Sequence, residues 1–125
     1  SPGDETIVVR RELNAVAVNL WQRAPLWGAG LGNFLVRLPE ELPTKQIYFL
    51  QPVHNIYLLL LSEAGIIGFG LFLWLIIAAL KKRSVTPALI GLIILLFLGL
   101  IDHYPLTLQS GQLLFILLLS VTMAS

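Results

Sequence analysis

The residues of this sequence best suited to chemistry are His54 and Asn55, a histidine beside a carboxamide. A histidine takes up or releases a proton near neutral pH, and a neighbouring carboxamide can orient a substrate, so the pair could serve acid–base catalysis. The pair also suits the start of a helix, because Asn is a favoured N-cap residue. Taken alone, the two residues favour the capping interpretation.

The pair lies at the border between a polar segment and a long apolar run. Within residues 56–80 only Ser62 and Glu63 are strongly polar. As a helix this run would extend roughly 37 Å, which exceeds the roughly 30 Å of a bilayer's hydrocarbon core. We therefore predict a membrane-spanning helix over about 55–80, with His54 at the membrane surface.

Composition indicates an integral membrane protein. Hydrophobic residues make up 57% of the chain and charged residues 12%, and the mean hydropathy is +0.85; soluble domains hold about 25% charged residues. Most charged residues precede position 46, so a polar front part leads into an apolar back part. The net charge of +1 indicates no nucleic-acid partner, and the lack of cysteine excludes disulfides and thiolate metal sites. Without an initiator Met or a signal peptide, we expect the chain to be a fragment of a longer protein.

The front part is predicted to hold one helix, from Asp4 to Arg23, ended by Pro25 and Gly28. Its apolar residues recur at helical spacing and form one stripe: Leu13, Val16, Ala17, Leu20 and Trp21. Such a helix can lie on a membrane or protein surface, and an ordinary core helix has the same pattern.

Three alternating glycines, Gly28, Gly30 and Gly32, predict a tight loop after this helix. Their N–H groups could hold phosphate, but no strand precedes them, so we reject a dinucleotide-binding fold. We favour glycines that allow close packing of the backbone, and a weak anion site is the alternative. Residues 35–53 hold three prolines and the aromatic pair Tyr48-Phe49. We predict an extended surface loop there, near the membrane interface.

The back part predicts further helices over about 86–101 and 112–124. The cluster Lys81-Lys82-Arg83 precedes them, and short basic loops stay cytoplasmic. The last run is too short to cross a membrane before the chain ends, which we interpret as truncation. The fold class expected is therefore all-α: a polytopic integral membrane protein fragment, with residues 1–53 as an extracytoplasmic loop and residues 54–125 as a membrane domain.

Four short blocks follow one another within residues 8–80: Arg10-Arg11-Glu12, the run from Pro25 to Phe34, His54-Asn55-Ile56-Tyr57-Leu58, and Glu63-Ala64-Gly65-Ile66-Ile67-Gly68. Their succession resembles the C-terminal signature region of the O-antigen ligase and polymerase superfamily. The resemblance implies a polytopic membrane glycosyltransferase. Such an enzyme moves a glycan from a polyprenyl diphosphate carrier to a lipid, glycan or protein acceptor on the extracytoplasmic side of the cytoplasmic membrane.

The resemblance implies that His54 is the catalytic residue, which takes or positions the proton of the acceptor hydroxyl. It also implies that an arginine binds the diphosphate, since a guanidinium can do so bidentately and stabilise the charge of the leaving group. Arg10 suits the spacing to the glycine-rich loop best, and Arg11 is the runner-up. Asn55 and Asn33 are the further substrate-binding candidates.

Asp102 and His103 lie outside the family motif. Their predicted position on the same outer side as His54 makes them candidates for a wall of the site, although interfacial anchoring is the favoured interpretation. Glu63 lies within the apolar span, where a carboxylate is costly. We predict that it is structural and ties this helix to a neighbour beside Gly65 and Gly68.

No metal-ligand spacing is visible in the sequence, and the resemblance implies metal-independent transfer without a cofactor. The partners implied are a polyprenyl diphosphate-linked glycan donor, a lipid or glycan acceptor and membrane lipids. A polysaccharide polymerase of the same superfamily remains an alternative. So does a noncatalytic membrane scaffold or transporter fragment in which the His-Asn pair is a helix cap.

Overall fold

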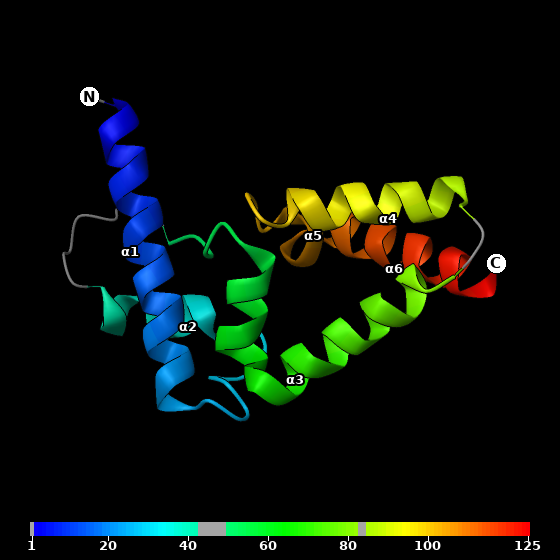
Figure 1. Ribbon diagram of the computed structural model, residues 1–125. Helices are drawn as coiled ribbons and strands as arrows, with labels where there is room; N and C mark the ends of the chain where they lie inside the picture. The colour runs from blue at the N-terminus through cyan, green and yellow to red at the C-terminus, as the bar shows by residue number, and fades with distance from the viewer. Residues whose placement is uncertain (1, 43–49, 83–84) are drawn as a thin grey trace.

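The protein is all-helical over the residues that the computed structural model describes, 2–42, 50–82 and 85–125 (Figure 1). The helices are α1 (Pro2–Arg23), α2 (Phe34–Glu41), α3 (Ile56–Leu80), α4 (Pro87–Leu98), α5 (Tyr104–Thr107) and α6 (Gln109–Ala124). The expected all-α class is confirmed for these ranges. The aromatic pair Tyr48-Phe49, predicted to lie near the interface, falls outside them, as does Arg83.

A first core forms around α1, which confirms the helix predicted to end at Arg23. The stripe of α1 packs against α2, against the residue before His54 and against the first turn of α3. The buried residues of this core are Leu13, Val16, Ala17, Leu20, Phe34, Leu38, Val53 and Leu59. The front part of the chain therefore shares a hydrophobic core with the start of the long apolar helix.

Helix α2 corrects the prediction of an extended loop over residues 35–53. Phe34 and Leu38 lie one helical turn apart and are both buried in the first core. Pro39 follows within the same helix, where it lacks the N–H that would bond the carbonyl four residues earlier. The local pattern therefore argued against a helix. Burial of the two apolar side chains outweighs the unfavourable effect of Pro39 on the helix, because packing rather than propensity stabilises most short helices.

Helix α3 confirms the predicted long helix, but it is broken at Gly65, where φ is 65° and ψ is −169°. The glycine-rich loop packs into the break. Ala29 N donates to the Ser62 carbonyl at 2.8 Å, and Gly30 N donates to the Glu63 carbonyl at 2.8 Å. Carbonyls that a regular helix would satisfy internally are thus satisfied by the loop.

The backbone N–H groups that follow the break are satisfied by carbonyls of the same loop. Ile66 N donates to the Pro25 carbonyl at 2.9 Å and Ile67 N to the Leu26 carbonyl at 3.3 Å. The two backbones lie so close that a Cβ at Gly28, where φ is +71°, would sit 2.4 Å from backbone atoms of α3. The favoured prediction of packing glycines is confirmed for Gly28, because only a residue without a side chain permits this approach, whereas a Cβ at Gly32 would meet nothing within 4 Å.

A second core joins the end of α3 to α4 and α6, which run side by side in Figure 1. It contains Ile76, Ala79, Leu92, Leu95 and Phe115. Helix α4 ends at Leu98, earlier than predicted, and α6 begins at Gln109, before the predicted residue 112. The short helix α5 between them was not predicted.

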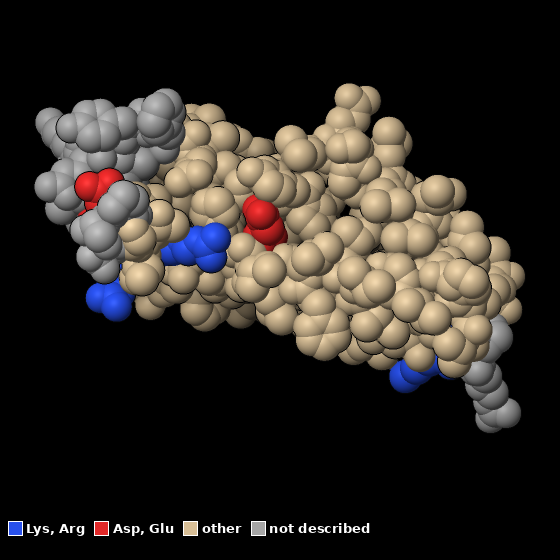
Figure 2. Space-filling view, turned by 90° about the horizontal axis from the view of Figure 1, so that it is seen from above, with Lys and Arg blue, Asp and Glu red and all other residues tan. Residues whose placement is uncertain are grey.

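Among the described residues α3 is the one helix long and apolar enough to cross a membrane, and only 17% of its most apolar window is buried. A core helix of a soluble protein with this composition would be mostly covered. Large apolar side chains such as Leu71 and Trp74 instead stand exposed. Figure 2 shows the same property of one face: a few charged side chains lie toward each end and an acidic group lies near the middle, but most of this face is uncharged.

Candidate active site

Hydrogen bonds between the start of α3 and the end of α4 bring distant polar residues together. Ile56 N donates to the Gly99 carbonyl at 2.8 Å, and Asn55 Nδ2 donates to the Leu100 carbonyl at 3.2 Å. Because the residue before Asn55 is His54 and the next polar residue after α4 is Asp102, this junction places the two segments side by side.

Asn55 is the N-cap of α3. Its Oδ1 accepts hydrogen bonds from Tyr57 N at 2.9 Å and Leu58 N at 3.0 Å. Together with the bond from Nδ2 to Leu100, these contacts engage both ends of its carboxamide. The capping interpretation therefore holds for Asn55, and its role in substrate binding stays a prediction.

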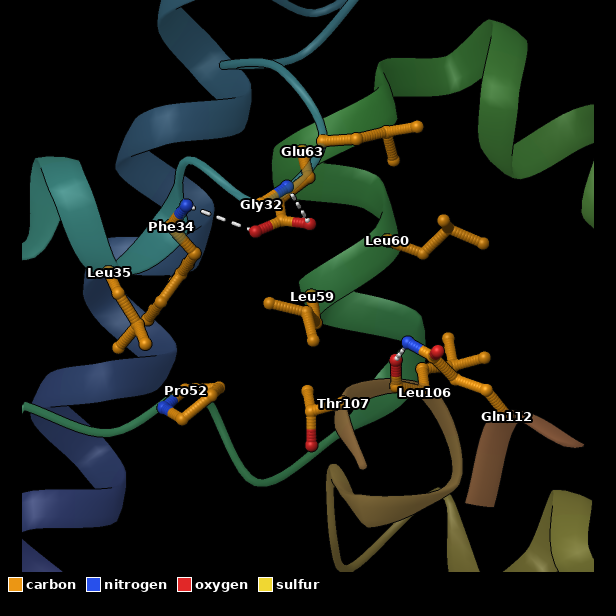
Figure 3. Close-up of a pocket in the computed structure, with 11 residues that line it drawn as sticks. Gly32, Phe34, Leu35, Pro52, Leu59, Leu60, Glu63, Leu106, Thr107 and Gln112 are labelled. Atoms are coloured by element: carbon orange, nitrogen blue, oxygen red, sulfur yellow. Dashed lines mark hydrogen bonds between the residues drawn. The ribbon is translucent and has the colours of Figure 1, made fainter. Parts of the chain in front are cut away.

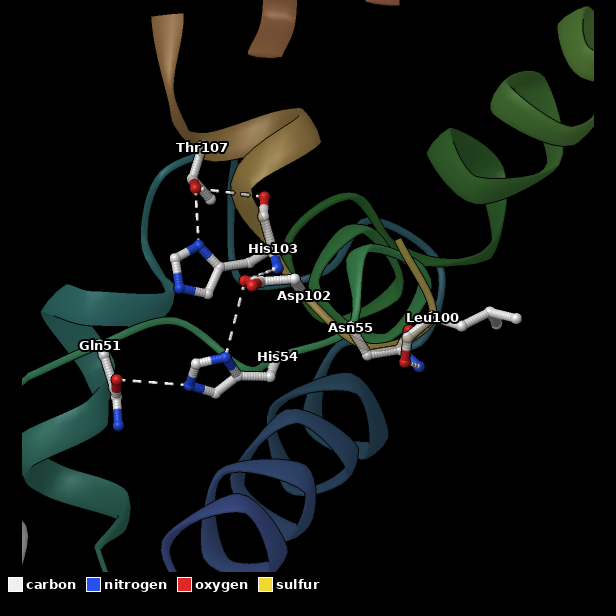
Figure 4. A network of polar contacts seen from close by, with 7 residues as sticks. All are labelled: Gln51, His54, Asn55, Leu100, Asp102, His103 and Thr107. Carbon is white, nitrogen blue, oxygen red and sulfur yellow. Dashed lines mark hydrogen bonds and ion pairs between the residues drawn. The ribbon is translucent and has the colours of Figure 1, made fainter. Parts of the chain in front are cut away.

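His54 makes none of these capping contacts and faces other polar groups (Figure 4). Its Nδ1 lies 3.7 Å from Asp102 Oδ1, and its Nε2 lies 3.3 Å from Gln51 Oε1. Its ring centroid is 5.0 Å from that of His103, which in turn contacts Thr107. We call these five residues the His54 cluster. The structure thus brings the two site-wall candidates directly to the histidine.

Within the cluster, two contacts hold His103 in place. Its backbone N donates to Asp102 Oδ1 at 2.7 Å, and its Nδ1 lies 2.7 Å from Thr107 Oγ1. Burial lowers the pKa of His103, the nearby His54 acts in the same direction, and Asp102 opposes both. The neutral form of His103 is therefore favoured at neutral pH.

Sequence analysis missed Gln51, whose only signal is its place three residues before His54. It also found no metal-ligand spacing, because the three groups that meet here are far apart in sequence. His54, Asp102 and His103 each offer a ligand atom, all within 4.8 Å of one another. Ligand atoms around one tetrahedral zinc ion stand about 3.3 Å apart. The three residues could hold a divalent cation only after drawing closer together.

A cavity of about 480 Å³ opens beside the cluster, between the glycine-rich loop, α2, α3 and the α5–α6 region (Figure 3). Its walls are mainly apolar, with side chains such as Leu35, Leu59 and Leu60. Thr107 belongs both to this lining and to the His54 cluster, since its hydroxyl contacts the His103 ring. Thr107 is therefore the residue that the cavity and the His54 cluster share.

The carboxylate of Glu63 closes another edge of the cavity. It accepts hydrogen bonds from Gly32 N and Phe34 N, each at 3.0 Å, and so holds the glycine-rich loop and the start of α2 (Figure 3). The prediction that Glu63 ties α3 to a neighbour is confirmed. The loop does surround an anionic group, but that group is a carboxylate of the same chain.

The remaining candidates lie elsewhere. Arg10 and Arg11 are exposed on α1, and no hydrogen bond or ion pair joins either of them to the His54 cluster in the part of the chain that the structure describes. Asn33 donates from Nδ2 to the Ala29 carbonyl at 2.9 Å, a contact within the glycine-rich loop. Substrate binding by these three residues stays a prediction.

Fold and site together define an all-helical protein with a histidine-centred polar cluster at one end of a helix long enough to span a membrane. A profile of the O-antigen ligase family matches residues 3–73, and the chain belongs to this family. The family is a membrane family of glycosyltransferase-like enzymes, and its substrates are lipid-linked glycans. No curated protein and no solved structure matches the chain. The matched region contains His54 and ends before Asp102.

Proposed function

We propose that the chain carries the catalytic centre of an O-antigen ligase-like enzyme. It transfers a glycan from a polyprenyl diphosphate-linked donor to an acceptor hydroxyl at the outer face of the cytoplasmic membrane. The observation that carries the proposal is His54. It lies within the family match, makes no capping contact among the described residues, and faces a carboxylate and a carboxamide beside a helix long enough to span a membrane.

In the proposed reaction the acceptor hydroxyl oxygen attacks the anomeric carbon of the glycan. The bond from that carbon to the diphosphate oxygen breaks, and the bonding pair leaves with the polyprenyl diphosphate. The hydroxyl proton passes to His54, which acts as general base. Acceptor and donor thus yield the glycosylated acceptor, free polyprenyl diphosphate and one proton, with no metal or cofactor required.

The donor needs positive charge for its diphosphate and apolar surface for its lipid. Arg10, or Arg11 as the alternative, supplies a guanidinium that binds the diphosphate and stabilises its charge as it leaves. The apolar cavity beside Thr107 suits an aliphatic part of one substrate. Binding both substrates at the start of α3 would hold the reacting atoms in line.

The basic residues that follow α3 support an extracytoplasmic site. The helix begins beside the His54 cluster and ends at Leu80, directly before Lys81 and Lys82. Because short basic loops stay on the cytoplasmic side, the opposite end of the helix would face outward. Residues 1–53 then form an extracytoplasmic segment, and residues 54–125 belong to a multi-pass membrane domain.

The experiment compares His54→Asn and His54→Ala with the wild type in the complete protein, purified and reconstituted in liposomes. Glycan transfer from an undecaprenyl diphosphate-linked donor is measured per folded molecule. Since neither variant can accept a proton near pH 7, both should lose about 10²- to 10⁴-fold in rate. Asn19→Ala, an exposed polar change on α1, serves as the matched control. Near-wild-type transfer by His54→Asn would leave the histidine without a catalytic role.

A further inference from the structure

We propose that Asp102 is a positioning residue for His54. Its carboxylate holds the imidazole as the tautomer with the proton on Nδ1, which leaves the lone pair of Nε2 to accept the proton of the acceptor hydroxyl. This inference rests on the proposed function and adds to it a residue that lies beyond the family match.

The first support is the geometry at His54 Nδ1. This atom is buried, and it has no hydrogen-bond partner among the residues that the structure describes. Asp102 Oδ1 stands 3.7 Å away, beyond hydrogen-bond length but within ion-pair range. An ionised carboxylate can only accept, and a neutral imidazole donates from one nitrogen alone. The carboxylate therefore favours the proton on the nitrogen that faces it.

The second support is that Asp102 is held in place. Its Oδ1 accepts a hydrogen bond from His103 N at 2.7 Å, so the carboxylate is fixed to the backbone that leads into α5. The segment before it is bound to the start of α3 by the bond from Ile56 N to the Gly99 carbonyl. The carboxylate and the imidazole thus belong to two backbones that are joined next to them.

The third support is that no competing cation faces His54 among the residues that the structure describes. The titratable groups in contact with its ring are Asp102 and His103. Since burial lowers the pKa of His103, that ring is neutral near pH 7 and does not cancel the charge of the carboxylate. The side chains of His54 and Asp102 are 18% and 35% exposed, so solvent screens their interaction only in part.

The opposite nitrogen faces Gln51. His54 Nε2 lies 3.3 Å from Gln51 Oε1, and turning the amide by 180° would put its N–H group in place of that oxygen. With the proton on Nδ1, the Gln51 amide N–H can donate to the Nε2 lone pair. An acceptor hydroxyl would then replace that contact with its own O–H, in the geometry that proton transfer needs.

The test uses Asp102→Asn in the complete protein in liposomes. Asparagine keeps the oxygen that accepts from His103 N but removes the charge that faces His54, so the local backbone contact survives. A second variant, Asp102→Ser, keeps a short acceptor for the same N–H and cannot reach the imidazole. Glu40→Gln, which changes an exposed carboxylate on α2 in the same way, is the matched control.

Two readouts decide the proposal. In solid-state ¹⁵N NMR of histidine-labelled protein, the signal lost in His54→Asn identifies His54. That signal should report a protonated Nδ1 in the wild type and a mixed or reversed tautomer in both Asp102 variants. In transfer assays kcat should fall at least about 10-fold, with KM for donor and acceptor unchanged, because removing the partner of a functional histidine costs from about 10-fold to about 10⁴-fold.

An unchanged His54 tautomer in Asp102→Asn, or an unchanged kcat, would overturn the proposal. So would transfer that is abolished by a chelator and restored by Zn²⁺, because Asp102 would then be a metal ligand. Failure of the proposed function looks different. Active His54→Asn protein would remove the catalytic role of the histidine, while the tautomer signal would still report whether Asp102 orients it.

Discussion

Gly65→Ala tests whether the glycine-rich loop and the break in α3 form one structural unit. The backbone at Gly65, with φ 65° and ψ −169°, lies in a region that only glycine adopts readily, and a side chain there costs about 1–3 kcal/mol. An added Cβ would also lie 2.3 Å from the Leu26 carbonyl oxygen, so the loop must move. Moving it breaks the bonds that Ile66 N and Ile67 N make to the loop, each worth about 0.5–1.5 kcal/mol.

These contributions predict a loss of roughly 2–6 kcal/mol in the free energy of unfolding, a large share of the roughly 5–15 kcal/mol that proteins have. The assay is the thermal midpoint of the purified protein in detergent, followed by size-exclusion chromatography after heating. The thermal midpoint of Gly65→Ala should lie at least about 5 °C below that of the wild type. Glycan transfer should fall with the folded fraction.

Gly70→Ala is the control, since it lies five residues further along the same helix and a Cβ there meets nothing within 4 Å. Alanine forms helix better than glycine by about 1 kcal/mol, so this variant should match or exceed the wild type in stability. Equal midpoints for Gly65→Ala and Gly70→Ala would refute the reasoning. The close packing of the loop into the break would then contribute nothing to the fold.

Two further predictions concern topology and pH. Leu50→Cys, at an exposed position before α3, should react with an impermeant thiol reagent added outside. Val85→Cys, at an exposed position after α3, should react only after the membrane is permeabilised. The reverse pattern would invert the proposed orientation. Because the pKa of His103 is lowered from 6.5 by burial, the unfolded chain binds more protons than the folded one just below that pH. Stability should therefore be complete above about pH 6.5 and should decrease as the pH falls toward the folded pKa. His103→Gln should flatten this dependence, and an identical pH profile in that variant would assign it to other groups.

The periodicity of apolar residues predicted the long elements well. The stripe of α1 is buried from Leu13 to Leu20, and α3 begins one residue after Asn55, which caps it. Both signals are local: a repeating pattern and a capping side chain fix a helix without reference to the rest of the chain. Where local signals conflicted with packing, the prediction was wrong, as for α2 around Pro39.

The break at Gly65 could not be predicted from the same signals. Residues 56–80 form an apolar run in which only Ser62 and Glu63 are strongly polar, and a glycine in such a run is compatible with a regular helix. Only the approach of the loop, with Gly28 against the α3 backbone, supplies alternative partners for the freed N–H and carbonyl groups. The partners of the Glu63 carboxylate could not be predicted either, because Gly32 and Phe34 are some thirty residues earlier in the chain.

By itself the sequence determined that this protein is helical and apolar, that His54 stands at the entrance to a long apolar helix, and which family's motifs surround it. Residue type and short-range spacing carry that information. The tertiary structure alone decided that Asp102 and His103 face His54 and that the amide nitrogen of Asn55 is bound to the Leu100 carbonyl. Those side chains meet because hydrogen bonds join the start of α3 to the end of α4, and no local pattern encodes a pairing between segments more than forty residues apart.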